Sequence, residues 1–147
     1  QKMVYPFKRR MMRKKVGVTL MKLQESGENY LETILILEKR NGIARSVDVA
    51  TELGFSKPSV SRAVSILKEG GYVTIGNIGQ LLLTDKGRQV AQNIYDRHCF
   101  IKECLMFLGV SPETAEADAC RLEHVLSEET LTCMKAHYEK HMPKSES

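Results

Sequence analysis

The sequence has no apolar run long enough to cross a membrane. Its apolar stretches are short, and Ile34 to Leu37, for example, is flanked by charged side chains, whereas a membrane-spanning helix needs roughly 18 or more apolar residues. The N-terminal segment also lacks the apolar core and small-residue cleavage site of a secretory signal. These absences predict a cytoplasmic protein with no membrane partner.

The motifs of common enzyme classes are missing as well. The chain contains no Gly-x-Ser-x-Gly, no Walker-type phosphate loop and no Gly-x-Gly-x-x-Gly, so the groups needed for nucleophilic or nucleotide chemistry are not in evidence. There is also no C-x-x-C pair, which argues against a structural zinc finger and a disulfide framework. We therefore expect a non-enzymatic protein with reduced thiols. The four cysteines are Cys99, Cys104, Cys120 and Cys133.

The positive charge is concentrated near the N-terminus. The chain has 147 residues and a formal net charge of +4, and eight of its 22 Lys and Arg residues occur among the first 22 positions. A length of this order is typical of one compact domain or two small ones that share an interface. Residues 1–26 are predicted to form a basic arm, which either adds phosphate contacts to DNA or has no role.

Two amphipathic helices are predicted after this arm. From Asn29 to Asn41 the apolar residues recur at three-to-four spacing, and a glycine follows where a helix would stop. Ser46 is placed to cap a second, short helix that ends before Gly54.

A third helix and a β-hairpin follow directly. Ser56 and Pro58 mark the start of the third helix, which ends before a glycine pair. Two β-prone runs, 72–75 and 80–84, then flank a glycine-rich turn. The order helix, helix, helix, hairpin predicts a winged helix-turn-helix DNA-binding domain over residues 27–86, in a mainly α protein.

The start of the third helix carries short hydrogen-bonding side chains and cations. In a helix-turn-helix this region faces base edges and phosphates, and Arg62 is the best candidate for base recognition. The alternative is that the serines only cap and solvate the helix. Asn77, in the hairpin turn, either contacts DNA as part of the wing or only shapes the turn. The predicted DNA-contacting residues are Ser56, Lys57, Pro58, Ser59, Ser61, Arg62 and Asn77.

The remainder is predicted to be helical. A long helix opens at Thr84 or Asp85 and carries an apolar seam as far as Leu108, followed by helices that begin at Ser111 and Ser127. We assign residues 87–142 to a dimerisation and metal-binding domain and residues 143–147 to a tail. The last two helices are the expected interface of a homodimer, because a two-fold DNA site requires two recognition helices about one DNA turn apart.

One helix of this second half carries a possible metal site. Cys120, Glu123 and His124 fall at positions i, i+3 and i+4, which places a thiolate, a carboxylate and an imidazole on one helical face. This set suits a divalent transition metal, although a helix also carries such residues without one. His98 and Glu32, on other predicted helices, supply further ligands. The pair His137 and His141 is interpreted as a solvated face instead.

Together these residues resemble the DtxR/MntR family of metal-dependent transcriptional repressors, in its short form without an SH3-like domain. The resemblance spans about Gly27 to Tyr138. It implies that Fe(II) or Mn(II) acts as corepressor and lets a homodimer bind a palindromic operator that controls metal homeostasis. The segments that carry it are Asn29-Tyr30-Leu31-Glu32, Ser56-Lys-Pro-Ser-Val-Ser61, Leu83-Thr84-Asp85-Lys86-Gly87, Arg97-His98 and Asp118-Ala-Cys-Arg-Leu-Glu-His-Val-Leu-Ser127.

The resemblance also implies roles for individual residues. Cys120, Glu123 and His124 correspond to principal ligands, together with the residue at Asn29, whereas His98 and Glu32 correspond to a neighbouring site that shares Glu123. Asn29 departs from the family pattern, because a neutral amide oxygen is a weaker ligand than the aspartate or methionine of relatives.

Lys102 is a second departure, since relatives place an acid there and a cation disfavours an ancillary metal site unless Glu103 or Glu116 substitutes. The Cys120 thiolate favours Fe(II), with Mn(II) next, and Zn(II), Co(II) or Ni(II) are expected to bind in vitro. The alternative function is a winged-helix regulator that responds to an oxidant or organic ligand through its cysteines.

Overall fold

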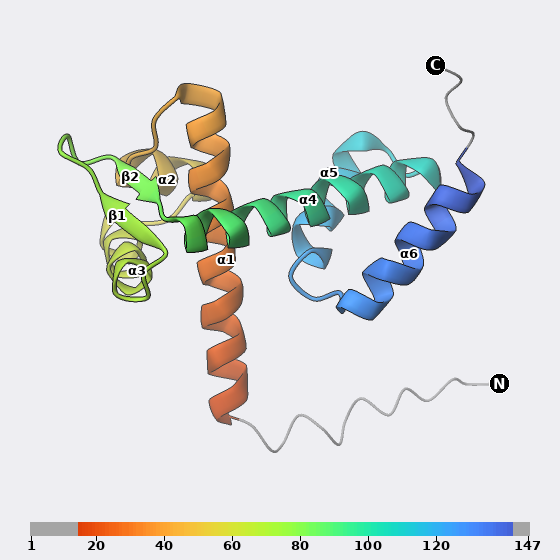
Figure 1. Ribbon diagram of the computed structural model, residues 1–147, viewed down its shortest axis with the longest axis horizontal. Helices are drawn as coiled ribbons and strands as arrows, with labels where there is room; N and C mark the ends of the chain where they lie inside the picture. The colour runs from red at the N-terminus through yellow and green to blue at the C-terminus, as the bar shows by residue number, and fades with distance from the viewer. Residues whose placement is uncertain (1–14, 143–147) are drawn as a thin grey trace.

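The computed structural model describes the backbone of residues 15–142 and the side chains of residues 25–142. This part of the chain forms two regions joined by one long helix (Figure 1). Its elements are α1 (Lys15–Asn41), α2 (Ser46–Leu53), α3 (Lys57–Glu69), β1 (Val73–Ile75), β2 (Leu81–Leu83), α4 (Asp85–Phe107), α5 (Pro112–Leu122) and α6 (Glu128–His141). None of the described helices has the length and apolar character needed to span a bilayer.

Most of the helix starts follow the predicted capping residues. The side chains of Ser56, Thr84, Ser111 and Ser127 each accept a hydrogen bond from the backbone N–H three residues later. Ser46, in contrast, is the first residue of α2 and not its cap, so that prediction is wrong. The preceding Arg45 donates its backbone N–H to the Asp48 carboxylate at 3.1 Å, which stabilises the helix start from within the first turn.

The first helix is longer than the apolar pattern predicts. It begins at Lys15 and therefore includes residues 15–26 of the predicted arm, whereas residues 1–14 lie outside the described part of the chain. The added segment contains no proline and is rich in residues with high helix propensity, which favours continuation of the helix.

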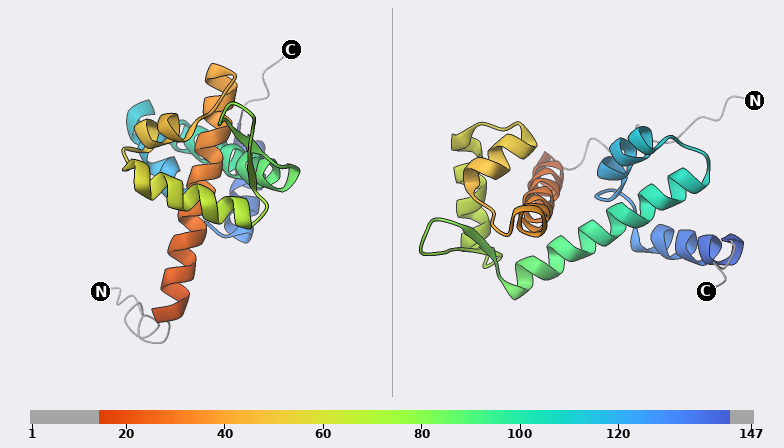
Figure 2. Two further views of the ribbon diagram at one scale, coloured as in Figure 1. Left: turned by 90° about the vertical axis from the view of Figure 1, so that its left-hand side faces the viewer. Right: turned by 90° about the horizontal axis from the view of Figure 1, so that it is seen from above.

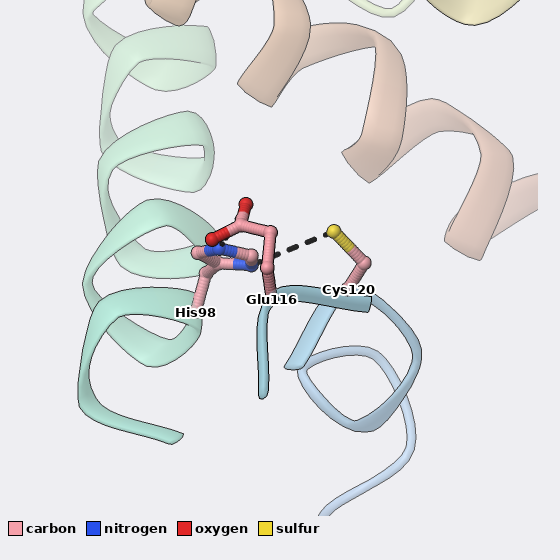
Figure 3. Close-up of side chains that lie close together, drawn as sticks. All are labelled: His98, Glu116 and Cys120. Carbon is pink, nitrogen blue, oxygen red and sulfur yellow. Dashed lines mark hydrogen bonds and ion pairs between the residues drawn. The ribbon is translucent and has the colours of Figure 1, made fainter. Parts of the chain in front are cut away.

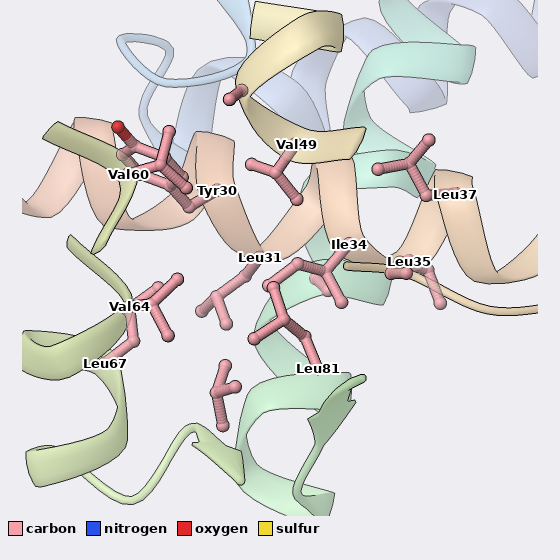
Figure 4. Packing of buried hydrophobic residues seen from close by; sticks show 14 residues of the cluster. Tyr30, Leu31, Ile34, Leu35, Leu37, Val49, Val60, Val64, Leu67 and Leu81 are labelled. Atoms are coloured by element: carbon pink, nitrogen blue, oxygen red, sulfur yellow. The ribbon is translucent and has the colours of Figure 1, made fainter. Parts of the chain in front are cut away.

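The N-terminal region is a winged helix-turn-helix, as predicted. The apolar face of α1 packs against α3 and the hairpin (Figure 4), with Ile34 fully buried at its centre. In the wing, β1 and β2 are antiparallel with Val73 opposite Leu83, and Leu81 donates its N–H to the Ala44 carbonyl at 2.8 Å. The labelled residues of this core are Tyr30, Leu31, Ile34, Leu35, Leu37, Val49, Val60, Val64, Leu67 and Leu81.

The helix α4 connects this domain to the smaller helical region (Figure 2). Its first half contacts α1 and the wing and its second half contacts α5. There a second core forms around Ile101, Ala119 and Leu131. Leu108, predicted on the apolar seam of this helix, is instead its C-cap residue and is 76% exposed. The long helix thus places His98 between α1 of one domain and α5 of the other.

Candidate metal centre and DNA-binding surface

Three segments bring the predicted ligands together. Glu32 comes from α1, His98 from α4 and Cys120 from α5. The structure corrects one prediction, because α5 ends at Leu122, so that Glu123 occupies the C-cap position and His124 lies in the turn beyond it. Cys120 therefore lies within α5, whereas Glu123 and His124 follow its last residue.

A contact from α4 helps to hold this turn. The Arg97 guanidinium donates a hydrogen bond to the Leu126 carbonyl, and the Leu126 N–H returns to the Leu122 carbonyl at 3.0 Å. Because Arg97 precedes His98 in the same helix, one turn of α4 both fixes the turn and supplies a side chain to the centre.

The Glu123 carboxylate is the hub of the centre. Its side chain is only 1% exposed, and one oxygen lies 2.7 Å from His98 Nδ1 while the other lies 3.1 Å from His124 Nε2. Glu32 completes a buried trio, since Glu32, His98 and Glu123 each offer a donor atom within 4.8 Å of the others. The two domains thus meet at a buried set of side chains that could hold a metal ion.

The charges in this cluster depend strongly on one another. Burial, reinforced by the negative charge of Glu123, raises the pKa of Glu32 to about 7. Hydrogen bonds to Cys120 and Glu123 raise the pKa of His98 to about 11. Burial disfavours the charged form of His124, but hydrogen bonds to Glu123 and Glu28 still raise its pKa to about 9. Protons on the two imidazoles therefore balance the buried carboxylates when no metal is bound.

A second trio adjoins the first and shares its histidine. Figure 3 shows His98, Glu116 and Cys120, whose donor atoms also lie within 4.8 Å of one another. Cys120 Sγ lies 3.8 Å from His98 Nδ1, and Glu116 Oε1 lies 3.0 Å from His98 Nε2. His98 therefore directs one ring nitrogen towards Glu123 and Cys120 and the other towards Glu116.

Glu28 also contacts this cluster, although its role was not predicted from the sequence. Its Oε2 lies 3.0 Å from His124 Nδ1, and its side chain is 23% exposed. Its position one helical turn before Glu32 places both carboxylates on one side of α1, and this spacing in the sequence could have indicated the contact. Asn29, the next residue, is half-buried. Its backbone carbonyl accepts a hydrogen bond from the Thr33 hydroxyl at 2.8 Å.

These residues fit a divalent transition metal. Carboxylate, imidazole and thiolate groups from three elements converge on one another, and His98 and Glu123 belong to the buried part of the molecule. When bound, the ion would supply positive charge that replaces the imidazole protons as the partner of the carboxylates. Glu32, His98, Glu123 and Cys120 would hold it, with His124 and Glu28 adjoining.

We expect metal affinity to rise with pH. His98 has a pKa of about 11 without metal, so an ion that binds its Nδ1 must displace one proton, and the proton competes better as pH falls. Between pH 6 and 8 the apparent association constant should increase at least tenfold for each pH unit, and more steeply below pH 7, where binding must also displace the proton of Glu32. Competition against an indicator chelator at several pH values, with proton release followed by a pH dye, measures this. An association constant that is independent of pH would contradict the proposed role of His98.

The surface predicted to bind DNA is exposed as required. Lys57, Pro58, Ser61 and Arg62 all lie on the open side of α3, and Asn77 lies at the exposed wing turn. Two of the predicted serines also have a structural role, since the hydroxyls of Ser56 and Ser59 are 2.8 Å apart at the helix start. The start of α3 therefore combines capping serines with exposed polar groups, and the contact of these groups with DNA stays a prediction.

Comparisons with known proteins agree with this architecture. The description "Iron dependent repressor, N-terminal DNA binding domain" matches residues 22–77, and "Iron dependent repressor, metal binding and dimerisation domain" matches residues 84–143. The chain is 38% identical over 114 residues to the transcriptional regulator MntR of Escherichia coli O6:H1, covering 78% of this chain and 74% of that protein. It is 36% identical over 102 residues to the regulator MntR of Geobacillus kaustophilus, covering 69% and 72%.

Solved structures show the same fold. The manganese regulator SloR superposes with a TM-score of 0.68 at 27% identity, covering 77% of this chain and 53% of that chain. A manganese-dependent transcriptional repressor in complex with manganese gives a TM-score of 0.71 at 25% identity, covering 77% and 52%. The chain thus spans about half the length of these two solved proteins.

Proposed function

The chain belongs to the DtxR/MntR family of metal-dependent transcriptional regulators, and we propose that it is a repressor with Fe(II) as its corepressor. The observation that carries the proposal is the position of the Glu123 carboxylate, which is buried between His98 and His124 and beside Glu32. Glu32 belongs to the DNA-binding domain and the others to the helical domain. An ion at this point would fix α1, and with it α3, relative to the rest of the protein.

The thiol of Cys120 supports Fe(II). Thiolate and imidazole ligands favour iron over manganese in the affinity order of divalent ions, whereas an all-oxygen site suits manganese better. Mn(II) is the second candidate, because two of the similar solved proteins are described as a manganese regulator and a manganese-dependent transcriptional repressor. Zn(II), Co(II) and Ni(II) should bind in vitro through the same groups.

The active form would be a homodimer on a palindromic operator. Two copies of α3 must reach successive major grooves, about 34 Å apart, and the helical region leaves apolar groups for a contact between copies. Within the described residues α6 buries only Leu131, and large apolar side chains nearby are exposed. These are Met106, Phe107, Leu108, Val125 and Met142.

Metal-dependent DNA binding tests this function. Random-sequence DNA selected anaerobically with Fe(II) should yield a two-fold symmetric site, and a chelator should weaken binding to that site about a hundredfold or more. Repeating the titration with Mn(II) shows which ion acts at the lower free concentration. Equal DNA affinity with chelator and with either metal would overturn the proposal and favour the cysteine-based oxidant sensor.

Arg62→Ala separates DNA recognition from metal binding within the same experiment. Arg62 is exposed on α3 and remote in sequence from the ligands. Its removal should weaken operator binding by about 1–3 kcal/mol, the usual value of one base-contacting side chain, and leave the metal affinity unchanged.

A further inference from the structure

An ion pair lies against His98, on the side away from Glu123. Lys102 Nζ is 2.6 Å from Glu116 Oε2, and the other oxygen of the same carboxylate is 3.0 Å from His98 Nε2. Lys102 follows His98 by one turn of α4, so the two side chains share a helical face. The Lys102 ammonium, the Glu116 carboxylate and the His98 imidazole are therefore linked by consecutive contacts that end at the metal centre.

Glu116 has the position and chemistry of a ligand. With His98 and Cys120 it forms a trio of donor atoms within 4.8 Å of one another (Figure 3). Lys102, however, already engages this carboxylate through a short contact. The Glu116 carboxylate can therefore pair either with the Lys102 ammonium, which is always present, or with a metal ion, which binds reversibly.

We propose that Lys102 sets the metal affinity of the centre by neutralising Glu116 and holding it as the hydrogen-bond partner of His98, outside the metal's ligand set. The inference rests on the proposed function, since it takes the Glu123 cluster as a metal site. In this arrangement Nε2–H donates to Glu116, and the Nδ1 lone pair is left for the ion beside Glu123 and Cys120. Lys102 and Glu116 act as positioning residues, because neither contacts the ion.

The charges of Lys102 and Glu116 predict whether each substitution raises or lowers the metal affinity. The Lys102–Glu116 pair is neutral as a whole, so removal of either member leaves one uncompensated charge beside the ion. The pair lies at the edge of the site, with side chains 36% and 50% exposed, so the surrounding water screens that charge strongly. A single charge on a partly exposed side chain next to a metal ligand changes the affinity for a divalent ion by about tenfold.

Four variants test the proposal with Co(II) as the probe ion. Lys102→Gln should bind Co(II) about tenfold more tightly than the wild type, because it frees an anionic carboxylate, and Glu116→Gln should bind about tenfold more weakly. The double variant should return to the wild-type affinity, and Lys102→Arg, which keeps the cation, should match the wild type. The visible absorption bands of Co(II) should change in Lys102→Gln alone, because Glu116 then becomes a ligand.

The outcomes separate this inference from the proposed function. Unchanged or weaker Co(II) binding by Lys102→Gln overturns the role of Lys102 while leaving the metal centre intact. Failure of the wild type to bind Co(II) overturns the proposed function and this inference with it. The opposite signs of the two single variants cannot arise from loss of folding, which weakens binding in both.

Discussion

Replacing Glu123 with glutamine is expected to abolish tight metal binding. The carboxylate is 1% exposed and contacts His98 at 2.7 Å and His124 at 3.1 Å. The amide has the same shape but no charge, and only one of its two polar atoms can bind a cation. Loss of outer partners of a metal ligand already lowers affinity 10- to 100-fold, so loss of this central ligand should lower it by about a hundredfold or more.

The measurement is an anaerobic competition of Fe(II) or Mn(II) between the protein and an indicator chelator. Glu129→Gln is the matched control, because Glu129 lies exposed in the first turn of α6 and should leave the affinity unchanged. Thermal unfolding without metal checks the fold of both variants. Wild-type affinity in Glu123→Gln would show that the ion binds elsewhere.

The same variant should also lose metal-dependent operator binding. If the ion acts by joining α1 to the turn after α5, then a protein unable to hold it behaves as the chelated wild type does at every metal concentration. Operator binding by Glu123→Gln that still responds to Fe(II) would separate the metal site from the DNA response.

The sequence predicted much of this centre because its ligands lie in strongly patterned segments. Glu32 and His98 belong to helices whose apolar periodicity and caps define which side faces inwards, and the winged domain follows from the hairpin after the third helix. The Thr84 cap was readable for the same reason, since its side chain bonds the Gly87 N–H within one turn.

Contacts between distant segments could not be read in this way. The spacing of Leu122 and Leu126 continues a helical pattern, but α5 ends at Leu122. In the turn that follows, the Leu126 carbonyl accepts a hydrogen bond from the Arg97 side chain of α4. The contact of Glu28 with His124 joins residues that are 96 positions apart. Both depend on how α1, α4 and α5 pack, which no local pattern specifies.

Gly87→Ala is expected to give the largest loss of stability among the substitutions considered. Gly87 lies in the first turn of α4, and a Cβ atom there would be 2.0 Å from the Tyr72 carbonyl oxygen. That carbonyl also accepts the Thr84 N–H at 3.0 Å, and Lys86 Nζ donates to the Gly70 carbonyl at 3.0 Å. The start of α4 is therefore bound closely to the segment between α3 and β1, and backbone cannot move aside as a flexible side chain can.

An alanine at this position must push α4 away from Tyr72 and disrupt these hydrogen bonds. We expect a loss of about 3 kcal/mol in the free energy of unfolding, which lowers Tm by about 10 °C for a chain of this size. Both proteins are compared with chelator present, since bound metal would stabilise the folded state by mass action.

Gly27→Ala is the matched control. Gly27 lies within α1, and a Cβ there would meet only the Leu67 side chain at 3.7 Å, an ordinary van der Waals contact. Alanine favours the helix by up to about 1 kcal/mol over glycine, so this variant should match or exceed the wild type. Equal Tm values for the two alanine variants would show that α4 can shift at its start without cost. Since α4 also carries His98, the loss in Gly87→Ala should extend to metal affinity, linking the packing of one glycine to the geometry of the metal centre.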